Sequence, residues 1–458
     1  MDAALSFSRQ HSPRFHAELE EFLRIPSVSA RSEHDGDTRA AAEWLSGRMT
    51  AAGLDSRVFE TPGHPVVLGE WRGAGADAPT LLIYGHYDVQ PAEPLELWTS
   101  PPFEPEVRDG RIYARGSADD KGQLHMHVKA LESWLAGAGR LPVNVVVVAE
   151  GEEEVGSPNL LPFVEEMADR LACDAVVISD SAMFDEGLPS LLFSLRGLAY
   201  LEVRVRTASG DLHSGAYGGA VANPAAALSR MIATLHDDHG RIAIPGFYDA
   251  VKEWDSATRD AIRALPFDED RFRSGVGATD LPGEAGYSTL ERLWIRPTCE
   301  VNGLLSGYTG QGAKTVLPAE AMAKISFRLV PDQDPARVGR LLEEHLRRVT
   351  PAGVTLDITE LHGGHPWRAD PTGPLFEAAG RALEAAFGAR PVLAGEGGSI
   401  PIVGDFERVL DAPALLVGFA LPGCNMHAPD EWFTVENYDR GIEALVRLYA
   451  ELGDALRG

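Results

Sequence analysis

Leu81-Leu82-Ile83-Tyr84-Gly85-His86-Tyr87-Asp88 is an apolar run that ends in a histidine and a carboxylate. Unbroken apolar runs are typical of strands buried on both faces, as in a parallel sheet. Three more such runs precede potential metal ligands: 143–148 before 150–154, 174–178 before Asp180, and 414–419 before His427. Because ligands bind outside the carboxyl ends of such strands, the pattern predicts a metal site at one edge of a parallel sheet.

The length and charge of the chain limit its organisation and its partners. Its 458 residues exceed the size at which one hydrophobic core keeps growing, so we expect two domains. The 41 Lys and Arg against 68 Asp and Glu give a formal net charge of −27. This charge would repel nucleic-acid phosphates and anionic lipid, so we expect neither as a partner.

The periodicity of the apolar residues changes along the chain. Helical patterns at 15–23, 38–52, 124–135 and 374–387 alternate with the buried strands, which predicts an α/β fold with a mostly parallel sheet flanked by helices. In the middle, 201–206 and 324–329 alternate apolar and polar residues, as antiparallel strands with one exposed face do. We therefore predict an inserted α+β domain at 196–361, between first-domain segments at 1–195 and 362–458. The polar stretch 255–291 is expected to be a long loop.

The cysteines and the N-terminal residues bear on location. Three scattered cysteines cannot form a disulfide framework, which favours a reducing compartment. The first residues have no basic segment followed by an apolar one, so no signal peptide is expected. No apolar run approaches the ~20 residues of a membrane helix. We therefore expect a cytoplasmic protein.

Carboxylates and histidines recur at the predicted strand ends. His86 is followed two residues later by Asp88, a pairing in which a carboxylate can fix the tautomer of a metal-bound histidine. The acidic stretch 150–154 follows an apolar strand directly, and a bound cation would relieve the repulsion among its carboxylates. Taken singly, each of these residues has an ordinary structural explanation, but together they predict a metal centre.

Several motifs, in this order along the chain, resemble those of the M20 family of co-catalytic metallopeptidases. They are Gly85-His86-Tyr87-Asp88-Val89, Ala118-Asp119-Asp120-Lys121-Gly122, Glu150-Gly151-Glu152-Glu153-Glu154-Val155-Gly156-Ser157, Ser179-Asp180 and Met426-His427-Ala428-Pro429. Further stretches are similar to the carnosinase-like cytosolic dipeptidases: Asp211-Leu212-His213-Ser214-Gly215, Phe327-Arg328-Leu329-Val330-Pro331, His362-Gly363-Gly364-His365-Pro366-Trp367 and Gly395-Glu396-Gly397-Gly398-Ser399-Ile400-Pro401. The resemblance covers nearly the whole chain.

The resemblance implies a dinuclear metal centre in the first, catalytic domain. It implies that Asp119 bridges two divalent ions, and that a cis peptide joins Asp119 to Asp120. His86 and Asp180 would complete one ion's ligands, and Glu154 and His427 the other's. Asp88 would orient His86, and Glu153 would be the general base for attack of a metal-bridging water on the amide bond of a dipeptide or short peptide with a free C-terminal carboxylate. The mixed ligands suit Zn²⁺ or Mn²⁺.

The resemblance also assigns the inserted domain as a lid through which two chains form a homodimer. His213 would reach the partner's active site and stabilise the oxyanion, with Thr315 approaching from the same lid. Arg328, Gly398 and Ser399 would hold the free carboxylate of the substrate. Asp430 stands where related dipeptidases often carry Asn or Gln, and could alter how the amino end of the substrate is held.

Two alternatives remain open at this point. The same metal site could serve an N-acyl amino acid deacylase, a desuccinylase or a glutamate-releasing carboxypeptidase, because the sequence does not reveal the pocket for the other end of the substrate. A non-catalytic binding module is the second alternative. The presence of all five ligand positions and Glu153 argues against it.

Overall fold

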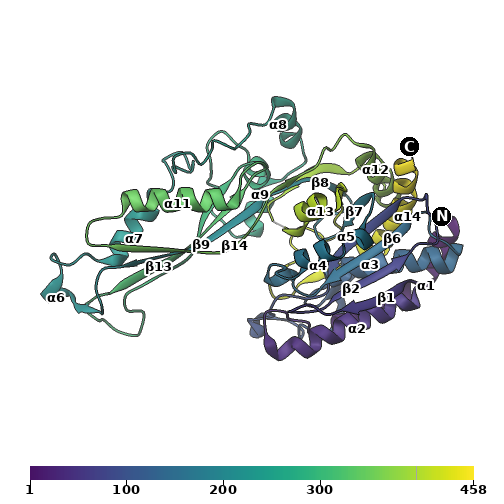
Figure 1. The fold of residues 1–458 in the computed structure, drawn as a ribbon, viewed down its shortest axis with the longest axis horizontal. Coiled ribbons are helices and arrows are strands. Elements are labelled where there is room, and N and C mark those ends of the chain that lie inside the picture. Colours follow the sequence, from purple (N-terminus) through teal and green to yellow (C-terminus); the bar gives the residue numbers. More distant parts are fainter. Residues whose placement is uncertain (399, 458) are drawn as a thin grey trace. The chain divides into compact units, whose positions relative to one another are not determined.

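The computed structural model describes residues 1–398 and 400–457, which form two compact units (Figure 1). The first unit contains Met1–Phe193, Ala369–Ala394 and Ile402–Gly458, and the second contains Ser194–Arg368 and Gly395–Pro401. The expected boundary after residue 361 falls inside a strand, β14 (Thr355–Gly364), which pairs with β9 (Gly197–Arg206) as far as Gly364. Pairing with β9 therefore keeps residues 362–364 in the second unit.

The large sheet has a parallel centre, as the apolar runs predict. Its strand order is β1-β2-β6-β3-β7-β17-β8-β15, with β16 also paired to β8. The strands are β1 (Asp55–Phe59), β2 (Val66–Trp71), β6 (Asn144–Glu150), β3 (Thr80–His86), β7 (Ala175–Ile178), β17 (Ala414–Leu416), β8 (Ser190–Leu195), β15 (Trp367–Arg368) and β16 (Val392–Glu396). The β6–β3, β3–β7 and β7–β17 pairs are parallel, whereas the β1–β2, β2–β6, β17–β8 and β8–β15 pairs are antiparallel. The predicted mostly parallel α/β sheet is confirmed at its centre.

Helices cover both faces of this sheet, which is why its central strands are apolar throughout. The ring of Tyr84 in β3 packs against Phe406 of α13 with centroids 5.4 Å apart, whereas the neighbouring Gly85 faces Leu124 of α3. Successive strand residues point to opposite faces, so α13 and α3 lie on opposite sides. The helices of this unit are α1 (Asp2–Leu23), α2 (Asp35–Ala51), α3 (Lys121–Glu132) continued by η3 (Ser133–Ala138), α4 (Leu160–Glu166), α5 (Ala168–Leu171), α12 (Pro374–Phe387), α13 (Ile402–Leu410) and α14 (Val435–Arg457).

The second unit is built on an antiparallel sheet with the strand order β11-β13-β9-β14. Its other strands are β11 (Thr298–Ser306) and β13 (Glu320–Leu329). Burial alternates along β9, and its buried residues share a core with α7 (Pro224–Ile232) and α11 (Pro335–Val349). One face is thus covered by helices, as the alternating pattern predicts. A short pair, β10 (Leu212–His213) and β12 (Val316–Leu317), adjoins α6 (Ser214–Tyr217).

The stretch 255–291 is not the long loop that its polarity suggests. It forms α8 (Ser256–Arg263) and α9 (Glu269–Gly275) and runs into α10 (Thr289–Trp294). Side chains of Asp255, Asp268 and Ser288 cap the three helices at their N-termini. Few residues of α8 and α9 are buried, so the apolar periodicity that reveals most helices is weak here.

Candidate metal centre

The candidate ligands come from the carboxyl ends of neighbouring parallel strands. His86 is the last residue of β3, and its register partner Glu150 ends β6. Asp180 follows β7, which pairs with β3 up to Tyr84–Ile178. Since parallel strands end at the same edge, His86 and Asp180 are delivered side by side.

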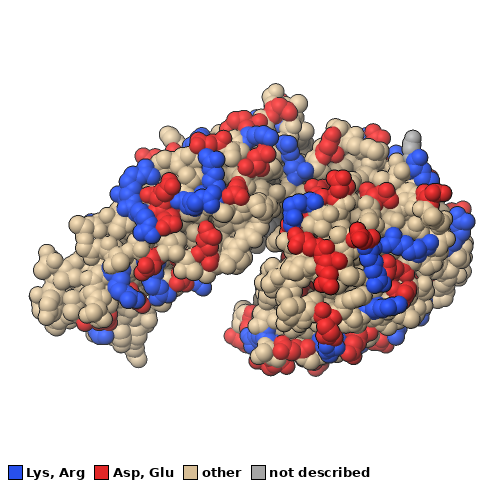
Figure 2. Space-filling view, in the orientation of Figure 1, with Lys and Arg blue, Asp and Glu red and all other residues tan. Residues whose placement is uncertain are grey.

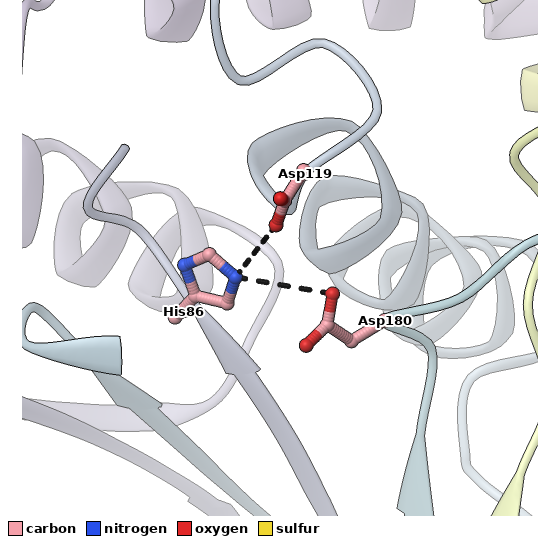
Figure 3. A group of neighbouring side chains, drawn as sticks. All are labelled: His86, Asp119 and Asp180. Carbon is pink, nitrogen blue, oxygen red and sulfur yellow. Dashed lines mark hydrogen bonds and ion pairs between the residues drawn. The ribbon is translucent and has the colours of Figure 1, made fainter. Parts of the chain in front are cut away.

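Two groups of three side chains meet closely enough to hold a metal ion, and they share Asp119. His86, Asp119 and Asp180 form one group, and Asp119, Glu154 and His427 form the other, with ligand atoms within 4.8 Å in each group. In the first group, Nε2 of His86 lies 3.0 Å from Oδ1 of Asp119 and 3.9 Å from Oδ1 of Asp180 (Figure 3). The structure therefore brings together all five residues assigned as ligands from the sequence.

The second group forms on the other oxygen of Asp119. Nε2 of His427 lies 2.8 Å from Oδ2 of Asp119 and 3.4 Å from Oε2 of Glu154. The side chain of His86 is fully buried, whereas 55% of the His427 side chain is exposed. The centre is therefore open to solvent on the His427 side.

The electrostatics of the metal-free centre fit the binding of cations. Burial, together with neighbouring charges, raises the pKa of Glu153 and Glu154 well above the ordinary value, and that of Asp180 to about 6. Burial also opposes a charge on His86, yet its hydrogen bond with Asp119 and the surrounding carboxylates raise its pKa well above the usual range. Without a metal, protons stabilise this group of carboxylates. Divalent cations among the same donors would replace those protons.

Asp119 lies in the turn that precedes α3. The Asp119–Asp120 peptide bond is cis, as the resemblance implies. The Oδ2 atom of Asp120 accepts a hydrogen bond from the backbone N–H of His86 at 3.2 Å. A Cβ atom at Gly85 would lie 2.8 Å from that oxygen, so only glycine permits this approach. Strand β3 and the turn before α3 are thereby held together.

Asp88 contacts the ring of His86 on the side away from the other candidate ligands. Nδ1 of His86 lies 3.1 Å from the carbonyl oxygen of Asp88 and 3.4 Å from its Oδ1. A neutral imidazole can donate its Nδ1–H to these oxygens and present the lone pair of Nε2 to a metal. Ser29 donates a hydrogen bond to Oδ2 of Asp88 at 2.6 Å and holds the carboxylate in place.

Glu153 and Glu154 begin a short 3₁₀ turn, η4 (Glu153–Val155), just after β6. The carboxylate of Asp88 accepts the backbone N–H groups of Glu153 and Glu154 at 3.2 and 3.1 Å. Gln90 donates to Oε2 of Glu154 at 2.7 Å. These contacts orient the turn so that Glu154 reaches His427, while the charges of His86 and Asp180 act on Glu153.

Glu431 is a buried residue that sequence reasoning did not select. Its carboxylate accepts hydrogen bonds from the Arg115 guanidinium at 2.7 Å and from the backbone N–H groups of Gly116, Ala118 and Asp119 at 2.9, 2.8 and 3.1 Å. Only its position four residues after His427, before the apolar stretch of β18 (Trp432–Thr434), hints at a structural role.

Asp430 interacts with the protein itself. Its carboxylate accepts hydrogen bonds from the backbone N–H and the hydroxyl of Thr99 at 2.8 and 2.7 Å. Its backbone carbonyl accepts a hydrogen bond from the side chain of Asn425 at 3.2 Å. These contacts hold the carboxylate against Thr99, and its expected influence on the amino end of the substrate stays a prediction.

The remaining predicted site residues belong to the second unit. His213 is exposed and caps α6 by accepting the N–H of Gly215 at 3.1 Å. Thr315 lies beside it, because its carbonyl accepts the N–H of Ser214 at 3.1 Å. The structure thus brings His213 and Thr315 together.

Arg328 lies near the end of β13, paired with Leu198 of β9. Burial lowers the pKa of Arg328, and the nearby Glu396 opposes this effect. The N–H groups of Gly397 and Gly398 both donate to Oε1 of Glu396. The Arg328 and Gly398 segments are thus linked through Glu396. Ser399 lies outside the described residues.

Relatives of known activity match the chain over nearly its full length. It is 33% identical over 425 residues to the cysteinylglycine-S-conjugate dipeptidase of Corynebacterium striatum, covering 91% of each protein. It is 32% identical to a Cys-Gly metallodipeptidase of Schizosaccharomyces pombe, covering 96% of this chain and 95% of the relative. It is 29% identical to the human Beta-Ala-His dipeptidase, covering 98% of this chain and 87% of the relative.

Solved structures agree with the sequence relatives. The dipeptidase Dug1p of Saccharomyces cerevisiae matches with a TM-score of 0.88 at 28% identity, covering 99% of this chain and 98% of that one. Human carnosine dipeptidase 1 matches with a TM-score of 0.87 at 27% identity, over 99% and 98% of the two chains. Every helix among the described residues is too short or too polar to cross a lipid bilayer. The model of peptidase family M20/M25/M40 matches residues 82–451, and the chain belongs to this family, as its motifs predict.

Proposed function

We propose that the protein is a metal-dependent dipeptidase. The observation that carries the proposal is the shared position of Asp119, whose two carboxylate oxygens face two separate groups of potential ligands. The named activities of the relatives support the choice of substrate, because they are dipeptidases that match most of the chain. Because these relatives are named as dipeptidases, we expect the substrate to be a small peptide.

Two divalent ions would be held by His86, Asp119 and Asp180 and by Asp119, Glu154 and His427. When bound, a pair of such ions acidifies a water molecule and polarises the scissile carbonyl group. The mixture of imidazole and carboxylate donors suits Zn²⁺ or Mn²⁺. The acidic surroundings of the centre favour two cations over one, because one ion would leave several buried carboxylates uncompensated.

Glu153 is the proposed general base. Burial and the neighbouring carboxylates raise its pKa well above its ordinary value, which makes it a stronger base than an exposed glutamate. It would accept the proton of the attacking water and deliver it to the leaving amine. Asp88 would act indirectly, by orienting His86 and the turn that carries Glu153.

The second unit would bind the ends of the substrate that the metal centre does not hold. The guanidinium of Arg328 can bind a free carboxylate through two hydrogen bonds, and Gly398 and Ser399 would supply further contacts. His213, which is exposed on its short strand, would stabilise the oxyanion in the site of a second subunit, with Thr315 beside it.

A homodimer through the second unit is part of this proposal. Strand β11 is an edge strand in the described sheet, and it carries exposed Val301, Leu304 and Leu305. Exposed apolar edges of this kind mark protein–protein contacts.

On the face drawn in Figure 2, acidic and basic side chains are interspersed, as on a solvated surface. A cytoplasmic location remains a prediction, supported by three free cysteines.

Hydrolysis of N-acyl amino acids by the same centre is not favoured. Amidases of the hydantoinase/carbamoylase family share the fold at 15% and 16% identity, far below the dipeptidases. The decisive experiment uses chelator-stripped protein, Zn²⁺ or Mn²⁺ added back, and matched dipeptides and N-acetyl amino acids. Metal-restored cleavage of the dipeptides supports the proposal and identifies the working metal. Cleavage of the acyl compounds alone would replace dipeptidase with deacylase.

A further inference from the structure

Glu431 lies between the two loops that supply Asp119 and His427. Its side chain is completely buried, and both of its carboxylate oxygens accept hydrogen bonds. One oxygen binds Arg115 and the N–H of Gly116, and the other binds the N–H groups of Ala118 and Asp119. Residues 115–119 therefore wrap around one carboxylate.

The backbone of Glu431 is fixed independently of its side chain. β5 (Arg111–Tyr113) and β18 form an antiparallel pair in which Tyr113 is opposite Trp432. The N–H of Ala114 donates to the carbonyl of Glu431 at 3.1 Å, which extends this ladder by one contact. The strand pair thus presents the Glu431 carboxylate to the loop from a rigid support.

Trp432, the residue after Glu431, closes the loop that carries His427. The N–H of Trp432 donates to the carbonyl of Cys424 at 3.0 Å, so the segment between them returns to its starting point. Within that segment, Nε2 of His427 meets Oδ2 of Asp119 at 2.8 Å. The distance between these two candidate ligands therefore depends on how the two loops are joined, and Glu431 joins them.

We propose that Glu431 is a positioning residue of the metal centre. Its carboxylate holds the backbone of residues 116–119, and with it Asp119, in place relative to the loop that carries His427. Its carboxylate binds groups of the protein itself, and it belongs to neither group of candidate ligands. The expected effect of Glu431 on catalysis rests on the proposed function. Its expected effect on metal affinity does not. Residues that hold a metal ligand from behind commonly change affinity or activity by about 10–100-fold when they are altered.

The test compares Glu431→Gln with a matched loss of a buried carboxylate elsewhere in the same unit. Glu18 is the control, because it is buried in α1 and its carboxylate forms ion pairs with Lys129, Arg14 and Arg48 and belongs to neither group of candidate ligands. Each full-length variant is stripped with chelator, titrated with Mn²⁺ by calorimetry, and melted without metal. Steady-state kcat and KM for a dipeptide are measured after Mn²⁺ is restored.

In Glu431→Gln the amide NH₂ faces the N–H donors, so the loop loses an acceptor. We expect Mn²⁺ to bind about 10–100-fold more weakly and kcat to fall with little change in KM. Glu18→Gln should lower the melting temperature while Mn²⁺ affinity stays that of the wild type. Wild-type Mn²⁺ affinity in Glu431→Gln would overturn the inference, as would an equal loss of affinity in Glu18→Gln.

Glu431→Asp decides the matter if Glu431→Gln does not fold. It keeps the charge opposite Arg115 but shortens the side chain by one methylene, so it cannot reach all four donors. We expect an Mn²⁺ affinity clearly below that of the wild type, and wild-type affinity would overturn the inference. If the wild type binds Mn²⁺ but cleaves no dipeptide, the proposed function fails, while the comparison of affinities still judges Glu431.

Discussion

The carboxylate of Asp88 accepts a hydrogen bond from the backbone N–H of Glu153 at 3.2 Å. The same carboxylate lies 3.4 Å from Nδ1 of His86 and accepts the N–H of Glu154 at 3.1 Å. One buried side chain therefore orients a candidate ligand from each group and the backbone of the proposed base. Asp88 connects parts of the centre that come from two different strands.

Replacement of Asp88 by Asn should lower kcat/KM by about 10–100-fold. The amide nitrogen cannot accept a hydrogen bond, so one of the two N–H groups at Glu153 and Glu154 loses its partner. Asp174→Asn is a suitable control, because Asp174 accepts the N–H of Thr80 at the opposite end of β3. Steady-state kinetics of both variants measure the effect. Equal activity in the two variants would argue against this role for Asp88.

Glu153→Gln should abolish most activity while retaining the metals. Removing a general base typically slows a reaction by about 10²–10⁴-fold, and the amide keeps the size of the side chain. Metal content by elemental analysis and kcat measured on the same sample separate the two effects. Glu152→Gln is the matched control, since the Glu152 carboxylate binds Asn159 and the N–H of His64. A Glu153→Gln enzyme with wild-type kcat would exclude Glu153 as the base.

Metal affinity should fall as the pH falls through 6. Burial, reinforced by the Asp119 carboxylate, raises the pKa of Asp180 to about 6, and a metal binds the deprotonated form. Protonation of Asp180 alone should make Mn²⁺ bind about tenfold more weakly at pH 5 than at pH 7. Calorimetry at pH 5.5 in two buffers of different ionisation enthalpy should detect protons released on binding, and a pH-independent affinity would contradict the prediction.

The same shift predicts how the stability of the metal-free protein depends on pH. The pKa of Asp180 is higher in the folded state than the ordinary value of 3.8, so the folded protein binds the proton more tightly. Its contribution to stability is present below about pH 3.8 and is lost as the pH rises to about 6. Thermal melts between pH 4 and 7 should therefore show a growing stabilisation by added Mn²⁺ as the pH rises.

Arg328→Met should raise KM for dipeptides by about 10–100-fold, the loss of a charged bidentate contact. Dipeptide amides, which lack the free carboxylate, should be affected far less. Arg204→Met is the control, because Arg204 lies on the same sheet and pairs with Glu202 and Glu320. Kinetics with matched dipeptides and dipeptide amides provide the comparison. An unchanged preference for the free acid would show that Arg328 does not bind the carboxylate.

Mixing two inactive variants tests whether His213 acts across a dimer. His213→Ala and Glu153→Gln should each have little activity, but a mixed dimer contains one site with both residues intact. After random exchange of subunits, about a quarter of the wild-type activity should return. Activity assays after refolding the two variants together measure this recovery. Two inactive variants that stay inactive after exchange would mean that His213 acts within its own chain or only in folding.

The sequence alone indicated the architecture and the chemistry of this protein. Unbroken apolar runs such as 81–84 are typical of strands covered on both faces, and residues that follow parallel strands gather at one edge of the sheet. His86 and Asp180 were predictable for that reason, and the order of the motifs identified the family. The helices α8 and α9 were missed because capping side chains define them more than a buried apolar face does.

Only the tertiary structure decided how the ligands are held. Glu431 lies 312 residues from Asp119 along the chain, and its carboxylate looks no different in the sequence from any surface glutamate. Its role depends on a strand pair and a loop that meet only after folding. Likewise, Asp88 reaches Glu153 across 65 residues because β3 and β6 are parallel neighbours. Local patterns report burial and backbone preference, whereas hydrogen bonds between distant segments depend on how the whole chain packs.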